Sequence, residues 1–158
     1  MSAKIVRLIG ILIIAISLII LVYLSGDSKY SEMPQIIGGS CVYNDYPGKA
    51  VITSIQMTDK SKAQATTLGG PGYSGYEIYF KFMTDKQIKE DWPRSTLDKK
   101  HLLLLVNSWY PGKEFIKKYH IEVNKEFNCT FKVINKGTCT PIIFEFKNIK
   151  RDDYFESK

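Results

Sequence analysis

The sequence predicts an N-terminal transmembrane helix followed by one mainly-β domain, and three observations lead to this fold class. Residues 8–24 form an uncharged apolar run of 17 residues, and a helix spans a bilayer with about 17–25 such residues. Several later segments alternate apolar and polar residues with a period of two, which is typical of half-buried strands. Clusters rich in Gly, Pro, Asn and Ser separate these segments, as turns between strands would.

The apolar run is predicted to be an uncleaved signal-anchor helix within residues 1–26. It is longer than the core of a cleavable signal peptide, which has about 7–15 residues. A removed signal peptide is the alternative. Lys4 and Arg7 precede the run, whereas the charges that follow it nearly balance. The positive-inside rule therefore places the N-terminus in the cytoplasm and the C-terminal domain outside it, in the periplasm or at the cell surface.

The remaining chain divides by composition. Residues 27–40 contain few aliphatic side chains, together with Pro34 and the Gly38-Gly39 pair, and are expected to form a stalk. Residues 41–148 are expected to form the extracytoplasmic β domain. Residues 149–158 are predicted to be a polar tail. Because the stalk is short, the domain should stay close to the bilayer.

The first half of the domain predicts two strands joined by a long loop. A strand is expected over residues 49–58, after a turn at residues 46–48, where Pro and Gly follow Tyr. Residues 59–75, rich in Gly, Ser, Thr and Lys, have no hydrophobic period and read as a loop. Residues 76–83 give the clearest alternation in the chain, which predicts the second strand.

The second half predicts a buried strand, a short helix and a hairpin. Residues 84–100 are charged and read as a break, whereas residues 101–107 form a short apolar run that fits a central strand. Residues 113–119 can form two helical turns with one apolar face. The hairpin is expected to have arms at 127–134 and 138–146, joined by a three-residue turn at 135–137.

This element order is that of an OB-type barrel. Such a barrel has five strands, is partly open, and carries its helix between the third and fourth strands. A small β-sandwich is the alternative architecture.

Three cysteines, Cys41, Cys129 and Cys139, all follow the apolar run. In an exported domain one pair is expected to be oxidised and one thiol left over, with three pairings possible. A bridge between Cys41 and Cys139 is favoured slightly, because it would clip the entry of the domain to its last hairpin. The alternative is three buried or free thiols in a reducing compartment.

The titratable residues do not form a recognisable catalytic or metal-binding motif. The sequence has only two histidines, His101 and His120, and neither has a second ligand at metal spacing. The chain is therefore expected to be non-enzymatic, with no cofactor and no metal. The net charge of +6 is scattered along the sequence, which does not favour nucleic-acid binding.

Loop aromatics are the remaining candidates for a binding site. In an OB-type barrel the loop between the first two strands borders the usual binding face, where aromatics stack on ligands. Packing at the barrel ends is the competing role for these side chains. The candidates are Tyr73, Tyr76, Trp92, Trp109 and Tyr110.

The function predicted from the sequence is that of an accessory subunit. The membrane would hold the chain through residues 8–24, and the β domain would bind a partner protein in an envelope complex. A module that binds glycan or cell-wall polymer through the loop aromatics is the alternative.

Overall fold

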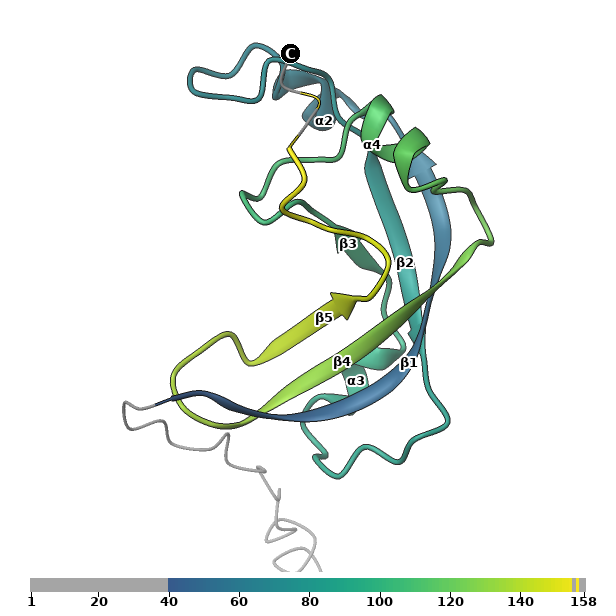
Figure 1. Cartoon of the computed structure of the whole chain (residues 1–158), viewed down its shortest axis with the longest axis vertical. Helices are drawn as coiled ribbons and strands as arrows, with labels where there is room; N and C mark the ends of the chain where they lie inside the picture. Colours follow the sequence, from purple (N-terminus) through teal and green to yellow (C-terminus); the bar gives the residue numbers. More distant parts are fainter. Residues whose placement is uncertain (1–39, 155, 157–158) are drawn as a thin grey trace, which may run out of the picture. The chain divides into compact units, whose positions relative to one another are not determined.

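A computed structural model describes residues 40–154 and 156, which form a mainly-β domain with a single antiparallel sheet of five strands (Figure 1). Residues 1–39, which include the predicted anchor and nearly all of the stalk, lie outside the described residues, as do residues 155, 157 and 158. Within the described part, no helix has the length and apolar character needed to cross a membrane.

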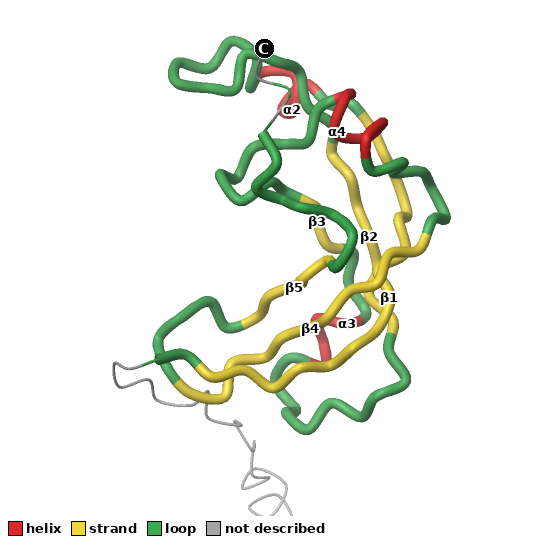
Figure 2. Tube along the Cα trace, viewed as in Figure 1, coloured by secondary structure: helices red, strands yellow, loops and turns green. Residues whose placement is uncertain are grey.

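The sheet curls into a half-barrel with short helices at its ends (Figure 2). The strand order is β3-β2-β1-β4-β5, and every neighbouring pair is antiparallel. The described strands are β1 (Val42–Gln56), β2 (Glu77–Met83), β3 (His101–Leu103), β4 (Glu126–Lys136) and β5 (Ile142–Phe146). The described helices are α2 (Asp59–Ala63), α3 (Arg94–Leu97) and α4 (Lys113–Lys118). These residues form one sheet, so the two-sheet sandwich is not observed.

Strand β1 produces the curl because its two halves pair with different neighbours. Residues 42–51 pair with β4, residues 49–56 pair with β2, and a register shift lies between Ile52 and Ser54. The strand bends where Gly48 passes close to β2, since a Cβ at this position would lie 2.2 Å from the Met83 carbonyl oxygen. Only glycine fits so close an approach. The turn predicted at residues 46–48 is therefore wrong, and this segment is a bend inside one long strand.

The core lies on the concave face of the sheet and is dominated by aromatic rings. Phe131 of β4 is fully buried and lies 5.5 Å from the Phe82 ring and 5.1 Å from the Phe144 ring, between centroids. Phe80 of β2 makes edge contacts with Phe144 and Phe146 at 5.3 and 5.2 Å. These residues come from strands on both sides of β1, so the aromatic contacts hold the curl closed.

Three further boundaries differ from the sequence predictions. The strand predicted over 101–107 ends at Leu103, because Leu105 and Val106 bond instead to the carbonyls of Trp109 and Arg151. The predicted loop 59–75 begins with helix α2, which Thr58 and Ser61 start with a reciprocal capping box. The predicted turn at 135–137 is also wrong, because β4 continues to Lys136 and the connection to β5 is longer.

The disulfide favoured from the sequence is present. Cys41 and Cys139 are bonded with their Cα atoms 6.1 Å apart, which joins the residue before β1 to the loop that leads into β5. Cys129 is the free, buried thiol, on β4. Burial, together with the nearby Glu145 carboxylate, raises the pKa of the Cys129 thiol to about 12. This thiol is therefore protonated at neutral pH.

Candidate binding site

The structure gathers four of the five candidate aromatics at the end of the half-barrel that carries α2 and α4. Tyr110 is 8% exposed, whereas Tyr73, Tyr76 and Trp109 are half-buried. Trp92 is separated from this group, since it lies in the loop before α3 and packs against the core. Packing thus accounts for much of the surface of these side chains, and their role in binding stays a prediction.

A buried glutamine anchors the loop between β1 and β2 to the segment before α4. Gln64 is 3% exposed, and its side-chain amide donates to the Tyr110 carbonyl at 3.1 Å and accepts from the Tyr110 N–H at 2.9 Å. The Tyr76 N–H also donates to the Pro111 carbonyl at 2.8 Å. The Gln64 amide thus satisfies both backbone groups of Tyr110, as a neighbouring strand would. These two hydrogen bonds hold the Gly-rich loop against the segment before α4.

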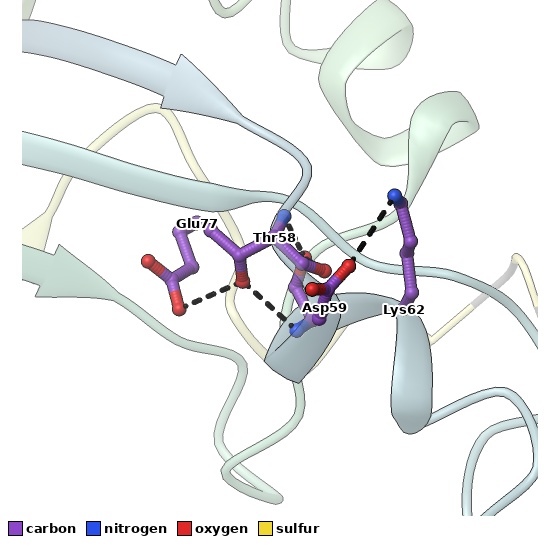
Figure 3. Close-up of polar contacts among 5 residues, drawn as sticks. Thr58, Asp59, Lys62 and Glu77 are labelled. Carbon is purple, nitrogen blue, oxygen red and sulfur yellow. Dashed lines mark hydrogen bonds and ion pairs between the residues drawn. The ribbon is translucent and has the colours of Figure 1, made fainter.

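A polar network ties α2 to β2 at the same end (Figure 3). The Thr58 hydroxyl accepts from the Ser61 N–H and donates to a Glu77 carboxylate oxygen, both at 3.1 Å. The Tyr79 hydroxyl donates to the other Glu77 oxygen at 3.3 Å. Glu77 is only 8% exposed, and these hydroxyls provide the hydrogen bonds that a buried carboxylate requires. Both Glu77 oxygens have a hydrogen-bond partner within the domain, so the network stabilises the loop.

The chain after β5, residues 147–154, crosses from the end of β5 to α4, and we name it the strap. Arg151 donates from Nε to the Leu104 carbonyl at 2.7 Å, and its own carbonyl accepts from Val106. Asp153 accepts from the Tyr119 hydroxyl at 2.7 Å and pairs with Lys118. The predicted polar tail therefore contributes ordered contacts along one side of the half-barrel.

Glu156 lies beyond the strap and caps helix α4. Gly112 at the N-cap of α4 has no side chain, and the Glu156 carboxylate accepts from the Phe115 N–H instead. Burial, together with the neighbouring Glu114, raises the pKa of Glu156, although its backbone hydrogen bonds act in the opposite direction. This carboxylate stabilises the end of the helix and is not free to act on a ligand.

The outer edge of β5 is a second candidate binding feature. Within the described residues, β5 pairs only with β4, and β3 at the other edge of the sheet pairs only with β2. Edge strands are usually protected by lysines, prolines or bulges because their free N–H and C=O groups invite pairing. The sequence of β5, IIFEF, carries none of these and has Glu145 as its one charge.

Two adjoining cavities follow this edge, and together we name them the edge groove. Each has a volume of about 280 Å³. One extends towards Leu102 of β3 and Leu104 just after it, and the other extends along the strap. The two cavities share four lining residues: Ile143, Phe144, Phe146 and Arg151. The charged side chains Glu145, Lys150 and Asp152 also line the cavity along the strap. Pockets for small molecules usually have about 300–1,000 Å³, so each cavity suits one or two side chains of a larger partner better than a whole small ligand.

A further hollow of about 580 Å³ lies between α4 and the strap and is less suited to a defined ligand. Charged groups of both signs line it, including Lys147, Lys150 and Asp152. All three are exposed, and exposed mixed charges are well solvated without a partner.

The His101 ring on β3 contacts two aromatic rings of the core, Phe144 and Phe80. It lies 4.3 Å from the Phe144 ring and 5.5 Å from the Phe80 ring, between centroids, and Nε2 donates to the Thr96 carbonyl at 2.9 Å. Burial lowers the pKa of His101 and Lys99 lowers it further, although the hydrogen bond to Thr96 opposes the shift. The neutral ring thus bridges β3 and β5.

This shift predicts a pH dependence of stability. The unfolded chain binds a proton at His101 below its ordinary pKa of 6.5, whereas the folded domain binds it only at lower pH. The free energy of unfolding should therefore fall as pH decreases from about 7 through 6.5 towards the folded pKa. Urea unfolding at stepped pH measures this slope. His101→Gln should reduce it, whereas the control His120→Asn, at the exposed histidine, should retain it.

Comparison with known proteins gives no relative on which to model the site, since no protein-family model, curated protein or solved structure matches the chain. The candidate site thus depends on the geometry of the described residues alone.

Sequence reasoning missed the residues that form the edge groove. The sequence predicts a hairpin arm at Phe144 and Phe146, but the pattern does not indicate that one side of this arm has no neighbouring strand. Arg151 falls in the predicted polar tail, but its side chain donates to the Leu104 carbonyl. A run such as IIFEF next to a loop cysteine signals a strand, but only the sheet order reveals that it is an edge.

Proposed function

We propose that the chain is a membrane-anchored, non-enzymatic accessory subunit whose extracytoplasmic β domain binds a partner protein in an envelope complex. The observation that carries this proposal is the free edge of β5 beside a groove of half-buried apolar side chains. Exposed apolar surface next to an unpaired strand is typical of sites where another chain adds. The apolar run at residues 8–24 would hold this site near the bilayer.

We further propose that the half-barrel is an OB-type barrel. In support, it has five strands, helix α4 follows β3 and precedes β4, and the described edges β3 and β5 do not pair with one another. A partly open barrel with the helix at this position is the arrangement of that fold.

The alternative, glycan binding through loop aromatics, has weaker support. Stacking on a sugar needs an accessible ring face. Tyr110 is 8% exposed, and Tyr76 and Trp92 pack against the core. We therefore favour a protein partner at the edge groove.

Site-specific photo-crosslinking in membranes tests the proposed function. The full-length chain would carry p-benzoylphenylalanine at Ile143 in the edge groove or, as a matched control, at Leu68, a fully exposed apolar residue in the loop between β1 and β2. We expect one discrete crosslinked protein from the Ile143 position and none from the Leu68 position. The same protein should co-purify in stoichiometric amount with the unmodified chain.

A charge in the groove gives the second arm of this test. Ile143→Asp should abolish co-purification, because burying an uncompensated carboxylate against the partner is costly, whereas Leu68→Asp should not. Ile143 is only half-buried in the free domain, so the new carboxylate stays hydrated there and the domain should still fold. Equal crosslinking from both positions, or co-purification that survives Ile143→Asp, would contradict the proposal.

A further inference from the structure

We infer that the partner supplies an extended apolar segment that pairs with the free edge of β5 and places an acidic side chain against Arg151. The inference rests on the proposed function and adds to it the secondary structure and the charge of the bound segment. Three features of the edge groove support it: a β5 edge with no neighbouring strand, apolar walls beside β3, and the Arg151 guanidinium. Glu145, Lys150 and Asp152 also line the cavity along the strap, but no ion pair between them and Arg151 is present in the described residues.

The backbone of β5 requires a strand rather than a helix or a small ligand. One side of β5 is bonded to β4 through the register from Cys129 opposite Phe146 to Val133 opposite Ile142. In the described part of the chain the other side has no strand beside it. Alternate residues of a strand point their N–H and C=O groups to each side, so the free side of β5 presents a row of groups that an added strand satisfies in full.

The walls of the groove indicate apolar side chains on the added strand. Phe144 contacts the core rings and yet is only half-buried, whereas Phe131 opposite it on β4 is fully buried. Leu102 and Leu104 across the groove are also half-buried. Covering these side chains would remove apolar surface from water, which favours association. Side chains of a strand alternate between its two faces, so every second residue of the segment should be apolar.

Arg151 supplies the charge that selects the segment. Its Nε donates to the Leu104 carbonyl, and among the described residues no carboxylate forms an ion pair with its guanidinium group. The remaining N–H donors of the guanidinium can form a fork that binds a carboxylate with two parallel hydrogen bonds. Arg151 lines both cavities of the edge groove, so it lies near the middle of the path. The acidic residue should therefore be internal to the segment.

A charge-swap experiment with peptides tests this inference. Two acetylated and amidated nine-residue peptides would alternate valine and threonine and differ only at the central residue, which is glutamate or lysine. We expect the glutamate peptide to bind the wild-type domain about tenfold more tightly than the lysine peptide. Arg151→Glu should reverse this preference, and Arg151→Gln should reduce it to about one. Fluorescence anisotropy of labelled peptides, with the full chain in detergent, measures the affinities.

The fold of each variant is checked by thermal unfolding, because Arg151 also bonds to Leu104. If Arg151→Glu does not fold, Arg151→Gln alone tests the loss of preference. Ile143→Asp should abolish binding of both peptides. A preference that is the same in wild type and in the Arg151 variants, or no saturable binding below about 1 mM, would overturn the inference. The proposed function fails separately, when Ile143 gives no specific crosslink in membranes.

Discussion

Replacing both Cys41 and Cys139 with alanine is expected to lower the free energy of unfolding by about 4–5 kcal/mol. The disulfide closes a loop with a sequence separation of 98 residues, and a crosslink of this span removes much of the conformational entropy of the unfolded chain. Urea unfolding of the two proteins at neutral pH, followed by tryptophan fluorescence, measures the difference. Adding reductant to the wild-type protein should produce the same loss.

Cys129→Ala is the matched control for this prediction. Cys129 is 1% exposed and packs in the core, so its truncation should cost about 1 kcal/mol through lost packing. Reductant should lower the free energy of unfolding of Cys129→Ala by the same amount as that of the wild type. A double variant at Cys41 and Cys139 that loses no more than the Cys129 variant would contradict the assigned contribution of the crosslink.

Replacing Phe131 with alanine is expected to lower the free energy of unfolding by about 3–5 kcal/mol. Phe131 is fully buried, and its ring contacts those of Tyr46, Phe82 and Phe144. These rings come from three other strands, so the cavity would lie where the two halves of the curled sheet meet. Chemical unfolding, monitored by circular dichroism, gives the loss.

Phe144→Ala provides the comparison, because the same side chain occupies a half-buried position at the edge of the same sheet. Phe144→Ala removes less buried apolar surface than Phe131→Ala does. The free energy of unfolding should therefore fall by about 1–3 kcal/mol. A larger loss of unfolding free energy for Phe144→Ala than for Phe131→Ala would contradict this prediction. It would show that the edge groove is closed in solution and that Phe144, not Phe131, lies at the centre of the core.

The sequence predicted the strands whose signal is local. Residues 76–83 alternate cleanly, and β2 covers all but the first of them. The short helix predicted over 113–119 is α4 to within one residue. Both predictions succeeded because period and turn chemistry depend on near neighbours along the chain. The pairing of Cys41 with Cys139, which the sequence favours only slightly among three possible pairings, is confirmed.

The failures have a different physical origin. The Pro and Gly of residues 46–48 predict a turn locally, but pairing of this segment with β4 keeps the chain extended. Leu104 and Leu105 fit a strand by composition, yet their backbone groups bond to the strap and to the next loop. In each case a partner distant in sequence decides the local conformation, and one sequence contains no record of that partner.

The double role of β1 has a consequence for the timing of folding. Its C-terminal half meets β2 soon after synthesis, but Val42 pairs with Lys136 and Val51 pairs with Glu126. The N-terminal half must therefore wait, unpaired, until nearly the whole domain has emerged. Pairings between such distant residues form slowly. The N-terminal half of β1 therefore stays unpaired through most of the synthesis of the chain. Because Cys139 follows β4, the disulfide forms after β4 has paired with β1.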